Sequence, residues 1–481
     1  MIFSSHSHAL NNTCRQNHLD CSSAERQYKD LHQRNTTQSS IHHLPPELLS
    51  LILQYACPPV DLSQRYGIHR KPGSKLDKHF QFTLGAVSAH WRQITFSTPQ
   101  LWTSVDIVVR PNNLERSYDT LQLFLASSGE LPVSIGLKFF EDQQIKKTVN
   151  FPTILEHSHR IRELHLTNPP PSWVRSLTSS YTTMFCLSIE NPPGDDDLFF
   201  DVPCSHLSIE FTTSRILPRW ATITHLCLTE LQEDVCLELL KECINLVEFR
   251  NRAPTNFDLG PRIPVPTSPF ILPDLKIFEW PVYSQSYVDT AMLKNVHMPA
   301  LETLVWMEED RRSLDESDSR ITFFDHLPST LSVLHLDNRR SHFTFTSSIS
   351  YLIRRVLNVE HLFLQFVHGS GLASLICDLA IDDEAIDERP ALPRLKTIVL
   401  RVKAEVLSYF RDVFDALLGM IESRLHRRSR PLPQQQLKRL EIVVYSGQVE
   451  WPAEFKEEMK EFVKQGLELE IMEETMSVDW L

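Results

Sequence analysis

Histidines and glycines could support chemistry in this sequence, but none of them falls into a known reactive pattern. His42-His43, His157-x-His159 and His326 give neither an HExxH motif nor an ordered set of metal ligands. Gly369-Ser370-Gly371 lacks the third glycine of a dinucleotide-binding loop. No GxSxG elbow, Walker loop or kinase motif set occurs. We therefore predict no catalytic residue, no metal site and no cofactor, and we expect a protein that is not an enzyme.

Charged clusters are the next candidates for a site. Three acidic clusters occur, at Asp195-Asp196-Asp197, Glu308-Glu309-Asp310 and Asp382-Asp383-Glu384. They could hold a metal or a basic substrate, but solvated loops are the simpler interpretation. The basic run Arg424–Arg430 could be a nuclear-localisation signal or a patch for an acidic partner. We favour an exposed helix end and loop there.

Composition narrows the class of protein. The 481 residues are 42% hydrophobic, which is enough for a real core. The net charge of −13 leaves no basic excess, so we expect no nucleic-acid partner. The nine cysteines form no CxxC pair. No apolar run reaches about 18 residues, so we expect no membrane protein. The N-terminus has no signal-peptide pattern, so we expect no secreted protein. We expect an intracellular protein of the cytoplasm, the nucleus or both.

The N-terminal region divides into a polar tail and a first helix. Residues 1–40 are polar, so we expect a mostly disordered tail with a possible short helix near 23–32. The run from Leu44 to Leu53 predicts a helix, because Pro45-Pro46 suits a first turn and Glu47 complements the helix dipole. Cys57-Pro58-Pro59 ends it. Since this helix is apolar nearly all round, one of its faces calls for a partner.

Residues 58–105 contain an expected inserted loop followed by two further helices. The polar residues 58–79 predict the loop. One helical stripe follows, formed by Leu84, Val87, Trp91 and Ile94. A short helix is predicted at Pro99–Trp102, and a strand at 105–109.

The rest of the chain repeats one apolar pattern, a triad of the form φ-x-x-φ-x-φ in which φ is apolar. The triads are Ile161-Leu164-Leu166, Met184-Leu187-Ile189, Cys204-Leu207-Ile209, Ile223-Leu226-Leu228, Leu246-Phe249, Leu275-Phe278-Trp280, Leu301-Leu304-Trp306, Leu331-Leu334-Leu336, Val359-Leu362-Leu364, Leu395-Ile398-Leu400 and Leu437-Leu440-Ile442. Their middle residues are about 19–30 positions apart up to Leu362 and about 36–42 apart beyond it. Such a period is typical of leucine-rich repeats, each of which supplies one strand.

The stretches between triads predict helices on the convex side of a repeat array. They include 234–243, 351–357 and 404–425. Together these features predict an α/β fold, in which a helical N-terminal module precedes an irregular solenoid with a curved parallel sheet. Variable positions of the strands are candidate contacts on the concave face, although ordinary solvent-facing residues are the simpler interpretation. They are His165, Glu279, Trp306, His335, Gln365 and Arg401. For Trp280 and Trp306 we favour the core or the flank of the sheet.

Residues 44–102 resemble the F-box family. The match consists of Leu44-Pro45-Pro46-Glu47-Leu48-Leu49-x-x-Ile52, Val87-x-x-x-Trp91-Arg92 and Pro99-Gln100-Leu101-Trp102. The whole chain after the tail is similar to the F-box and leucine-rich-repeat proteins of mushroom-forming fungi. This resemblance implies three regions: a tail at 1–40, an F-box module at 41–105 and a leucine-rich-repeat-like solenoid at 106–481.

The resemblance also implies a mechanism. An F-box binds a Skp-type adaptor, which joins a cullin–RING ubiquitin ligase, while the repeats hold an unknown protein substrate. By position, the adaptor-binding residues would be Leu44, Pro45, Leu48, Ile52, Val87 and Trp91. Trp102 would close the small core against the first repeat strand. The alternative is a repeat scaffold for protein interactions that acts without ubiquitination.

Two departures from the family pattern bear on adaptor affinity. The loop 58–79 is longer than a compact F-box normally has, and Ser88-Ala89-His90 replaces the Cys/Lys/Arg-rich residues that are common before the tryptophan. Both leave the apolar positions intact.

Overall fold

The structure is a computed structural model of the chain. It describes residues 26, 29, 41, 44–57, 80–140, 154, 156–170, 173–174, 177, 184–190, 198–199, 203–210, 216–217, 220–252, 268–283, 287–309, 317–338, 347–366, 371–381, 390–409, 411–425, 436–473, 476–478 and 480. Most of the predicted N-terminal tail therefore lies outside the described residues, although Arg26 and Lys29 are helical. The predicted insertion 58–79 also lies outside them.

The chain forms two compact units, which we describe separately. Of the described residues from 44 onward, the first unit contains 44–57, 80–106 and 119–133, and the second contains 107–118 and 134–480. The first unit contains α2 (Pro46–Ala56), α3 (Phe80–Val87), α4 (Ala89–Phe96) and the 3-10 helix η3 (Pro99–Trp102). It also contains the beginning of β1 (Ser104–Val109) and the first residue of β2 (Val133–Phe139). Helix α5 (Leu114–Ser127) begins in the second unit and ends in the first.

The single helix predicted around Leu84–Ile94 is wrong, because the chain breaks at Ser88 into α3 and α4. Ser88 is the N-cap of α4, and its hydroxyl accepts a hydrogen bond from the Trp91 backbone N–H at 3.1 Å. The Arg92 Nε donates to the Gly85 carbonyl oxygen at 2.9 Å and so links the two helices. Leu84 and Ile94 are buried, whereas Val87 ends α3 with 58% of its side chain exposed.

The second unit is built on a fifteen-stranded sheet whose strands follow one another in chain order. After β1 these are β2 (Val133–Phe139), β3 (Ile161–Thr167), β4 (Cys186–Glu190), β6 (His206–Glu210), β8 (His225–Thr229), β9 (Glu248–Arg252), β11 (Ile277–Tyr283), β13 (Thr303–Glu309), β14 (Val333–Asn338), β15 (His361–Phe366), β16 (Thr397–Lys403), β17 (Arg439–Tyr445), β18 (Glu468–Glu473) and β19 (Met476–Ser477). From β3 to β18 each strand pairs parallel with the next, and β19 closes the series antiparallel.

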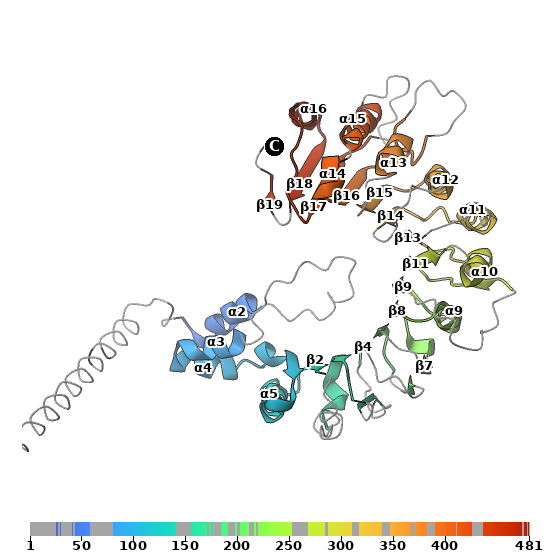
Figure 1. Ribbon diagram of the computed structural model, residues 1–481. Helices are drawn as coiled ribbons and strands as arrows, with labels where there is room; N and C mark the ends of the chain where they lie inside the picture. Colours follow the sequence, from blue (N-terminus) through green and yellow to red (C-terminus); the bar gives the residue numbers. More distant parts are fainter. Residues whose placement is uncertain are drawn as a thin grey trace, which may run out of the picture. The chain divides into compact units, whose positions relative to one another are not determined.

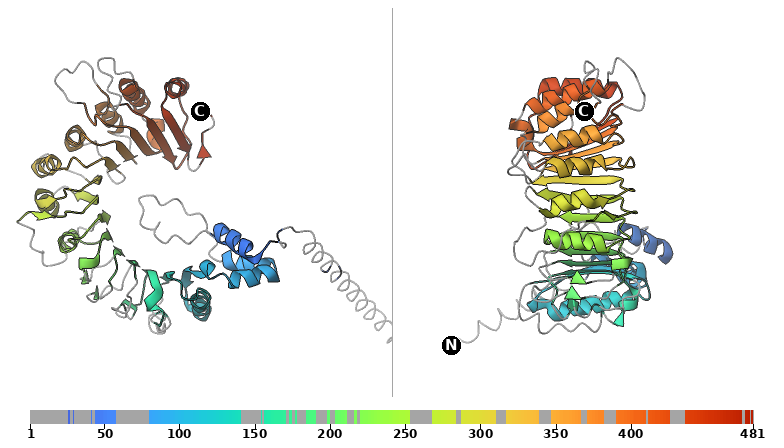
Figure 2. Two further views of the ribbon diagram at one scale, coloured as in Figure 1. Left: turned by 180° about the vertical axis from the view of Figure 1, so that it is seen from behind. Right: turned by 90° about the vertical axis from the view of Figure 1, so that its right-hand side faces the viewer.

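Helices connect the strands in the later part of this unit. They are α9 (Glu233–Glu242), α10 (Tyr287–Asn295), α11 (Ser317–Asp325), α12 (Ser347–Arg355), α13 (Leu372–Asp378), α14 (Ala404–Tyr409), α15 (Asp412–Leu425) and α16 (Ala453–Lys464). In Figures 1 and 2 the helices α9–α13, α15 and α16 cover the same face of the sheet. We call the opposite face the open face.

Short elements fill other connections of the second unit. Three are 3-10 helices: η4 (Pro111–Asn113), η5 (Ser158–Arg160) and η6 (Trp220–Thr222). Two small parallel sheets pair β5 (Leu198–Phe199) with β7 (Ile216–Leu217), and β10 (Phe270–Ile271) with β12 (Val296–His297).

The predicted apolar triads form the core beneath the helices. No residue of the eleven triads is more than 4% exposed. The register explains this, because the middle and last triad residues of neighbouring strands lie side by side, as Leu304, Leu334 and Leu362 do. The prediction of a mixed α/β fold with a large, mostly parallel sheet is confirmed.

Two tryptophans show which face of the strand is buried. Trp280 and Trp306 pair in register, and both are at most 1% exposed. The interpretation of Trp306 as a concave-face contact is therefore wrong, and the core interpretation is confirmed. The Trp280 indole N–H donates to the buried Asp289 carboxylate at 2.7 Å, so even its polar atom is satisfied inside the core.

Candidate functional site

Helix α2 carries an apolar surface that its own unit leaves uncovered. Pro46 begins the helix, and Glu47 lies in its first turn. Leu49 and Leu53 are buried, as residues four apart on one helix face should be. On the other side the exposed fractions are 50% for Leu48, 47% for Leu51, 44% for Ile52 and 83% for Tyr55. We call these four residues the α2 stripe.

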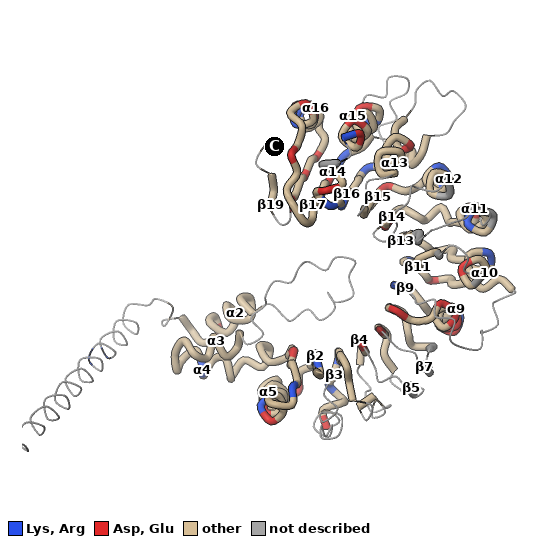
Figure 3. Tube along the Cα trace, in the orientation of Figure 1, with Lys and Arg blue, Asp and Glu red and all other residues tan. Residues whose placement is uncertain are grey.

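Few charged side chains lie on α2 and on the two helices that follow it. Helices α2, α3 and α4 contain only Glu47 and Arg92 as charged residues, and Figure 3 shows them almost entirely in the colour of uncharged residues. A large apolar area with so little charge is typical of a surface that another protein covers.

The predicted adaptor-binding residues lie in or beside these helices. Pro45 and Leu48 are exposed, Leu44 is half-buried, and Ile52 belongs to the α2 stripe. Val87 lies at the end of α3, and Trp91 lies half-buried in α4, which packs against α2. Sequence reasoning missed Leu51 and Tyr55 as members of the exposed surface, although their spacing of four from each other and of three from Leu48 and Ile52 signals it.

Trp91 has an unusual polar atom. Its indole Nε1 is buried and has no hydrogen-bond partner among the residues that the structure describes, while its backbone carbonyl accepts the Thr95 hydroxyl at 2.8 Å. An unmet buried donor costs free energy, so this side chain contributes less to the stability of the unit than a partnered tryptophan would.

Trp102 anchors the core of the first unit. Its ring stacks on Phe96 at 5.0 Å and meets the edges of Phe82 and Phe124 at 6.0 and 5.0 Å. The indole N–H donates to the Thr95 carbonyl at 2.8 Å. The ring partners of Trp102 thus come from α3, α4 and α5, whereas the sequence predicted closure against the first strand. This cluster holds in place the helices that display the α2 stripe.

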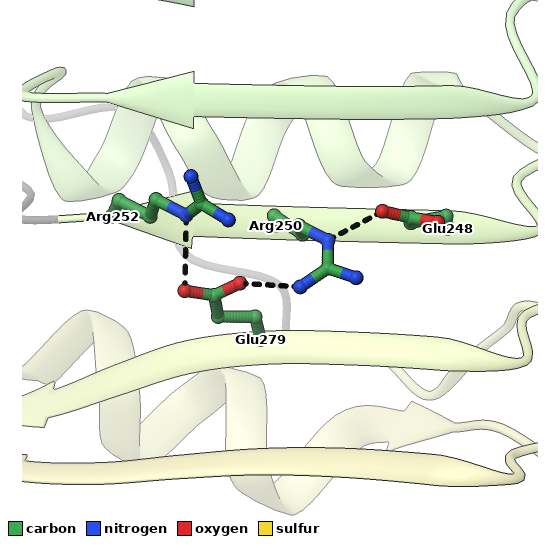
Figure 4. Close-up of polar contacts among 4 residues, drawn as sticks. All are labelled: Glu248, Arg250, Arg252 and Glu279. Atoms are coloured by element: carbon green, nitrogen blue, oxygen red, sulfur yellow. Dashed lines mark hydrogen bonds and ion pairs between the residues drawn. The ribbon is translucent and has the colours of Figure 1, made fainter. Parts of the chain in front are cut away.

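The open face of the second unit is a second candidate surface. Its best-defined polar feature is a network on β9 and β11, shown in Figure 4. Arg250 Nη1 and Arg252 Nε donate to the Glu279 carboxylate at 3.1 and 3.2 Å, and Arg250 also pairs with Glu248. Glu279 is only 2% exposed, so this carboxylate depends on the two guanidinium groups for its solvation.

A stack of rings lies earlier on the open face. The ring centroid of His206 lies 4.1 Å from that of Phe185, with the planes tilted by 35°, and His206 stacks on His225 at 3.8 Å with the two imidazoles nearly parallel. The Nδ1 atoms are within 2.9 Å of the hydroxyls of Ser205 and Thr224. Burial, and secondarily the neighbouring His225, lowers the pKa of His206 to about 4, and burial also lowers the pKa of His225. Both rings are therefore neutral at pH 7.

The remaining predicted concave-face residues lie on the open face in different surroundings. His165 is 1% exposed and holds the pKa of Glu163 below its usual range by a hydrogen bond. His335 stacks on Phe363, with ring centroids 4.1 Å apart. Gln365 and Arg401 are half-buried neighbours in register.

The prediction for the basic run Arg424–Arg430 is partly wrong. Arg424 is 2% exposed, and its guanidinium donates to the carbonyls of Leu379, Ala391 and Leu392 at 2.8–3.2 Å. The prediction of an exposed helix end is wrong for this residue, because three backbone acceptors replace its hydration. Residues 426–430 lie outside the described residues, as do the acidic clusters at 195–197 and 382–384 and the glycine pair at 369–371 except for Gly371 itself.

The thiols of the sheet have no reactive character. Cys204 and Cys227 are buried and free, and burial raises their pKa values to about 12 and about 11. A thiol protonated this strongly is a poor nucleophile. Within the described part of the chain, no cluster of three or more potential metal ligands occurs.

Helix length and similarity to known proteins add two findings. None of the helices that the structure describes combines the length and apolar character needed to cross a lipid bilayer. Comparison of the sequence with known protein families and with curated proteins finds no match.

Proposed function

We propose that this chain is the substrate-recognition subunit of a Skp–cullin–F-box ubiquitin ligase. Residues 41–105 are the F-box and bind the Skp-type adaptor. Residues 106–481 are an irregular leucine-rich-repeat solenoid that binds the target protein. The chain does no chemistry of its own and works in the cytoplasm, the nucleus or both.

The α2 stripe is the observation that carries this proposal. Leu48 and Ile52, together with Pro45, are the exposed α2 positions that the F-box resemblance assigns to the adaptor. A helix of eleven residues that leaves such apolar side chains in water gains free energy when a partner covers them. Exposure supports the proposal without reference to the family resemblance, and it agrees with the motif at Leu48 and Ile52.

The regular sheet supports the second half of the proposal. In the large sheet, each strand from β3 to β17 contributes buried residues of one triad, and each pairs in parallel with the next strand of that sheet. Parallel strands in chain order, connected by helices on one face, are typical of a leucine-rich-repeat solenoid. Such repeats commonly present a long open face to protein partners.

Adaptor binding is the direct test. The purified chain is mixed with a purified fungal Skp-type adaptor, and the affinity is measured by isothermal titration calorimetry. We expect binding in the micromolar range or tighter, and we expect Leu48→Glu with Ile52→Glu to abolish it. Gln54→Glu is the control for added charge on α2, because Gln54 is half-buried and lies outside the stripe; it adds one negative charge, whereas the double variant adds two.

Two outcomes decide against the proposal. If the wild-type chain does not bind the adaptor at micromolar concentration, the F-box assignment is lost. If the adaptor binds but a cullin–RING complex does not join it, the chain is a scaffold that works with the adaptor alone. Circular dichroism of the double variant shows whether its helices persist, so that loss of binding is not confused with unfolding.

A further inference from the structure

Arg401 of β16 differs from other arginines on the open face. In register it lies between Gln365 of β15 and Val443 of β17. Its Nε is buried without a hydrogen-bond partner, and among the described residues its guanidinium forms no hydrogen bond or ion pair. Arg250, Arg252 and Arg439 on the same face each bond to at least one carboxylate. Within the described part of the chain, Arg401 is therefore a cation without a bonded acceptor.

Partial burial makes the missing partner of the Arg401 guanidinium energetically important. Burial lowers the pKa of Arg401, while the charge of Glu441 opposes that shift. Glu441 itself accepts a hydrogen bond from Arg439 at 3.0 Å. A guanidinium that has lost water without gaining an acceptor is stabilised strongly by an added carboxylate, which can bond to it in a bidentate manner.

An apolar strip lies beside Arg401 along the central row of the open face. Val305, His335, Phe363 and Val399 are consecutive neighbours in register across β13–β16. The rings of His335 and Phe363 stack at 4.1 Å with planes only 6° apart, and Val305 and Val399 are at most 5% exposed. The half-buried rings of His335 and Phe363 are the accessible part of this strip, and their stacked pair can accept the side of an apolar or aromatic group.

We propose that β14–β17 bind an extended acidic segment of a partner protein through their open face. An Asp or Glu carboxylate of that segment pairs with Arg401, and a neighbouring apolar or aromatic side chain lies on the His335–Phe363 stack. A polypeptide fits better than a free anion, because an anion would leave the apolar strip uncovered. This inference rests on the proposed function, since the bound segment belongs to the substrate.

Peptide selection tests the inference. A phage-displayed library of random linear peptides is selected on the full chain, and the enriched peptides are synthesised with a fluorescent label. We expect enrichment of Asp or Glu next to an aromatic or aliphatic residue. Fluorescence anisotropy should then show that Arg401→Gln weakens binding about 10-fold to 100-fold, the range for loss of a charge-assisted hydrogen bond.

Matched variants separate the site from the fold. Arg439→Gln removes a cation from the same face that already has carboxylate partners, so it should change peptide affinity by less than about twofold. A peptide whose carboxylate is replaced by its amide should bind the wild type weakly and should lose no further affinity with Arg401→Gln.

Several results would overturn the inference. They are the absence of any enriched peptide, enrichment without acidic residues, or equal losses for Arg401→Gln and Arg439→Gln. Adaptor binding is measured on the same variants and should be unchanged by Arg401→Gln. If the wild-type chain selects acidic peptides but does not bind the adaptor, the proposed function is refuted and this site is not. If it binds the adaptor but shows no preference for acidic peptides, this site is refuted and the proposed function is not.

Discussion

Replacing Glu279 by Gln tests whether the network in Figure 4 stabilises the sheet. The change keeps the shape of the side chain but removes a charge that is only 2% exposed and accepts bonds from Arg250 and Arg252. Breaking a buried ion pair costs about 3–5 kcal/mol. Arg250 keeps Glu248 as a partner, and Arg252 is 23% exposed, so we expect a loss near the lower end, about 3 kcal/mol.

Urea denaturation followed by circular dichroism measures this loss. Glu470→Gln is the control, because Glu470 pairs with Arg439 at 2.8 Å but is 46% exposed, and we expect it to cost at most about 1 kcal/mol. Arg252→Gln in the Glu279→Gln background should cost less than it does alone, since the two groups interact. Equal transition midpoints for Glu279→Gln and the wild type would refute the reasoning, and so would strict additivity of the two changes.

Three further outcomes follow from buried groups. Folding lowers the pKa of His206 from the usual 6.5 to about 4, so the unfolded chain binds the proton more readily. The free energy of unfolding should therefore fall as the pH drops from about 6.5 to about 4. His206→Phe should flatten this part of a profile of melting temperature against pH. Trp102→Ala should destabilise the first unit by about 3–5 kcal/mol, measured by thermal unfolding, and unchanged unfolding would contradict the role of its ring cluster. Arg424→Met should lower the unfolding midpoint by more than Arg439→Met, because it leaves three buried carbonyls without their donor; an equal or smaller effect would show that water replaces the guanidinium.

Much of the core could be predicted from the sequence because the sheet repeats one simple rule. The apolar middle and last triad positions are buried in each of the eleven strands, so the triads identified the buried row directly. Strands β2 and β18 were not predicted. Strand β2 has apolar residues in alternation at Val133, Ile135, Leu137 and Phe139 but no triad. Before β18 the first triad position is occupied by Gly466, whose positive φ of 104° forms a turn, so the apolar triad is incomplete there.

Other features depended on contacts that no local pattern encodes. Ser88 divides one apparent helix because its hydroxyl caps the next one, and this changed the side on which Val87 lies. Arg424 resembled part of a solvated basic run, but carbonyls about 32–45 residues distant in sequence bury it. The exposed apolar surface of α2 could be predicted, since the helix has more apolar residues than one buried face needs. The missing partner of Arg401 could not be predicted, because it depends on which residues of β15, β16 and β17 lie side by side.

The last strands also determine how the molecules behave at high concentration. A parallel sheet ends in a row of backbone donors and acceptors that can pair with a second molecule. Here β19 pairs with Met472 and Glu473 of β18, and the Val478 N–H donates to the Ile471 carbonyl at 3.1 Å. The rest of that border carries the exposed side chains of Glu468 and Glu470, whose like charges repel an identical border on another copy. Resistance to edge-to-edge aggregation in this part of the protein therefore depends on charged side chains, and it should weaken at high salt.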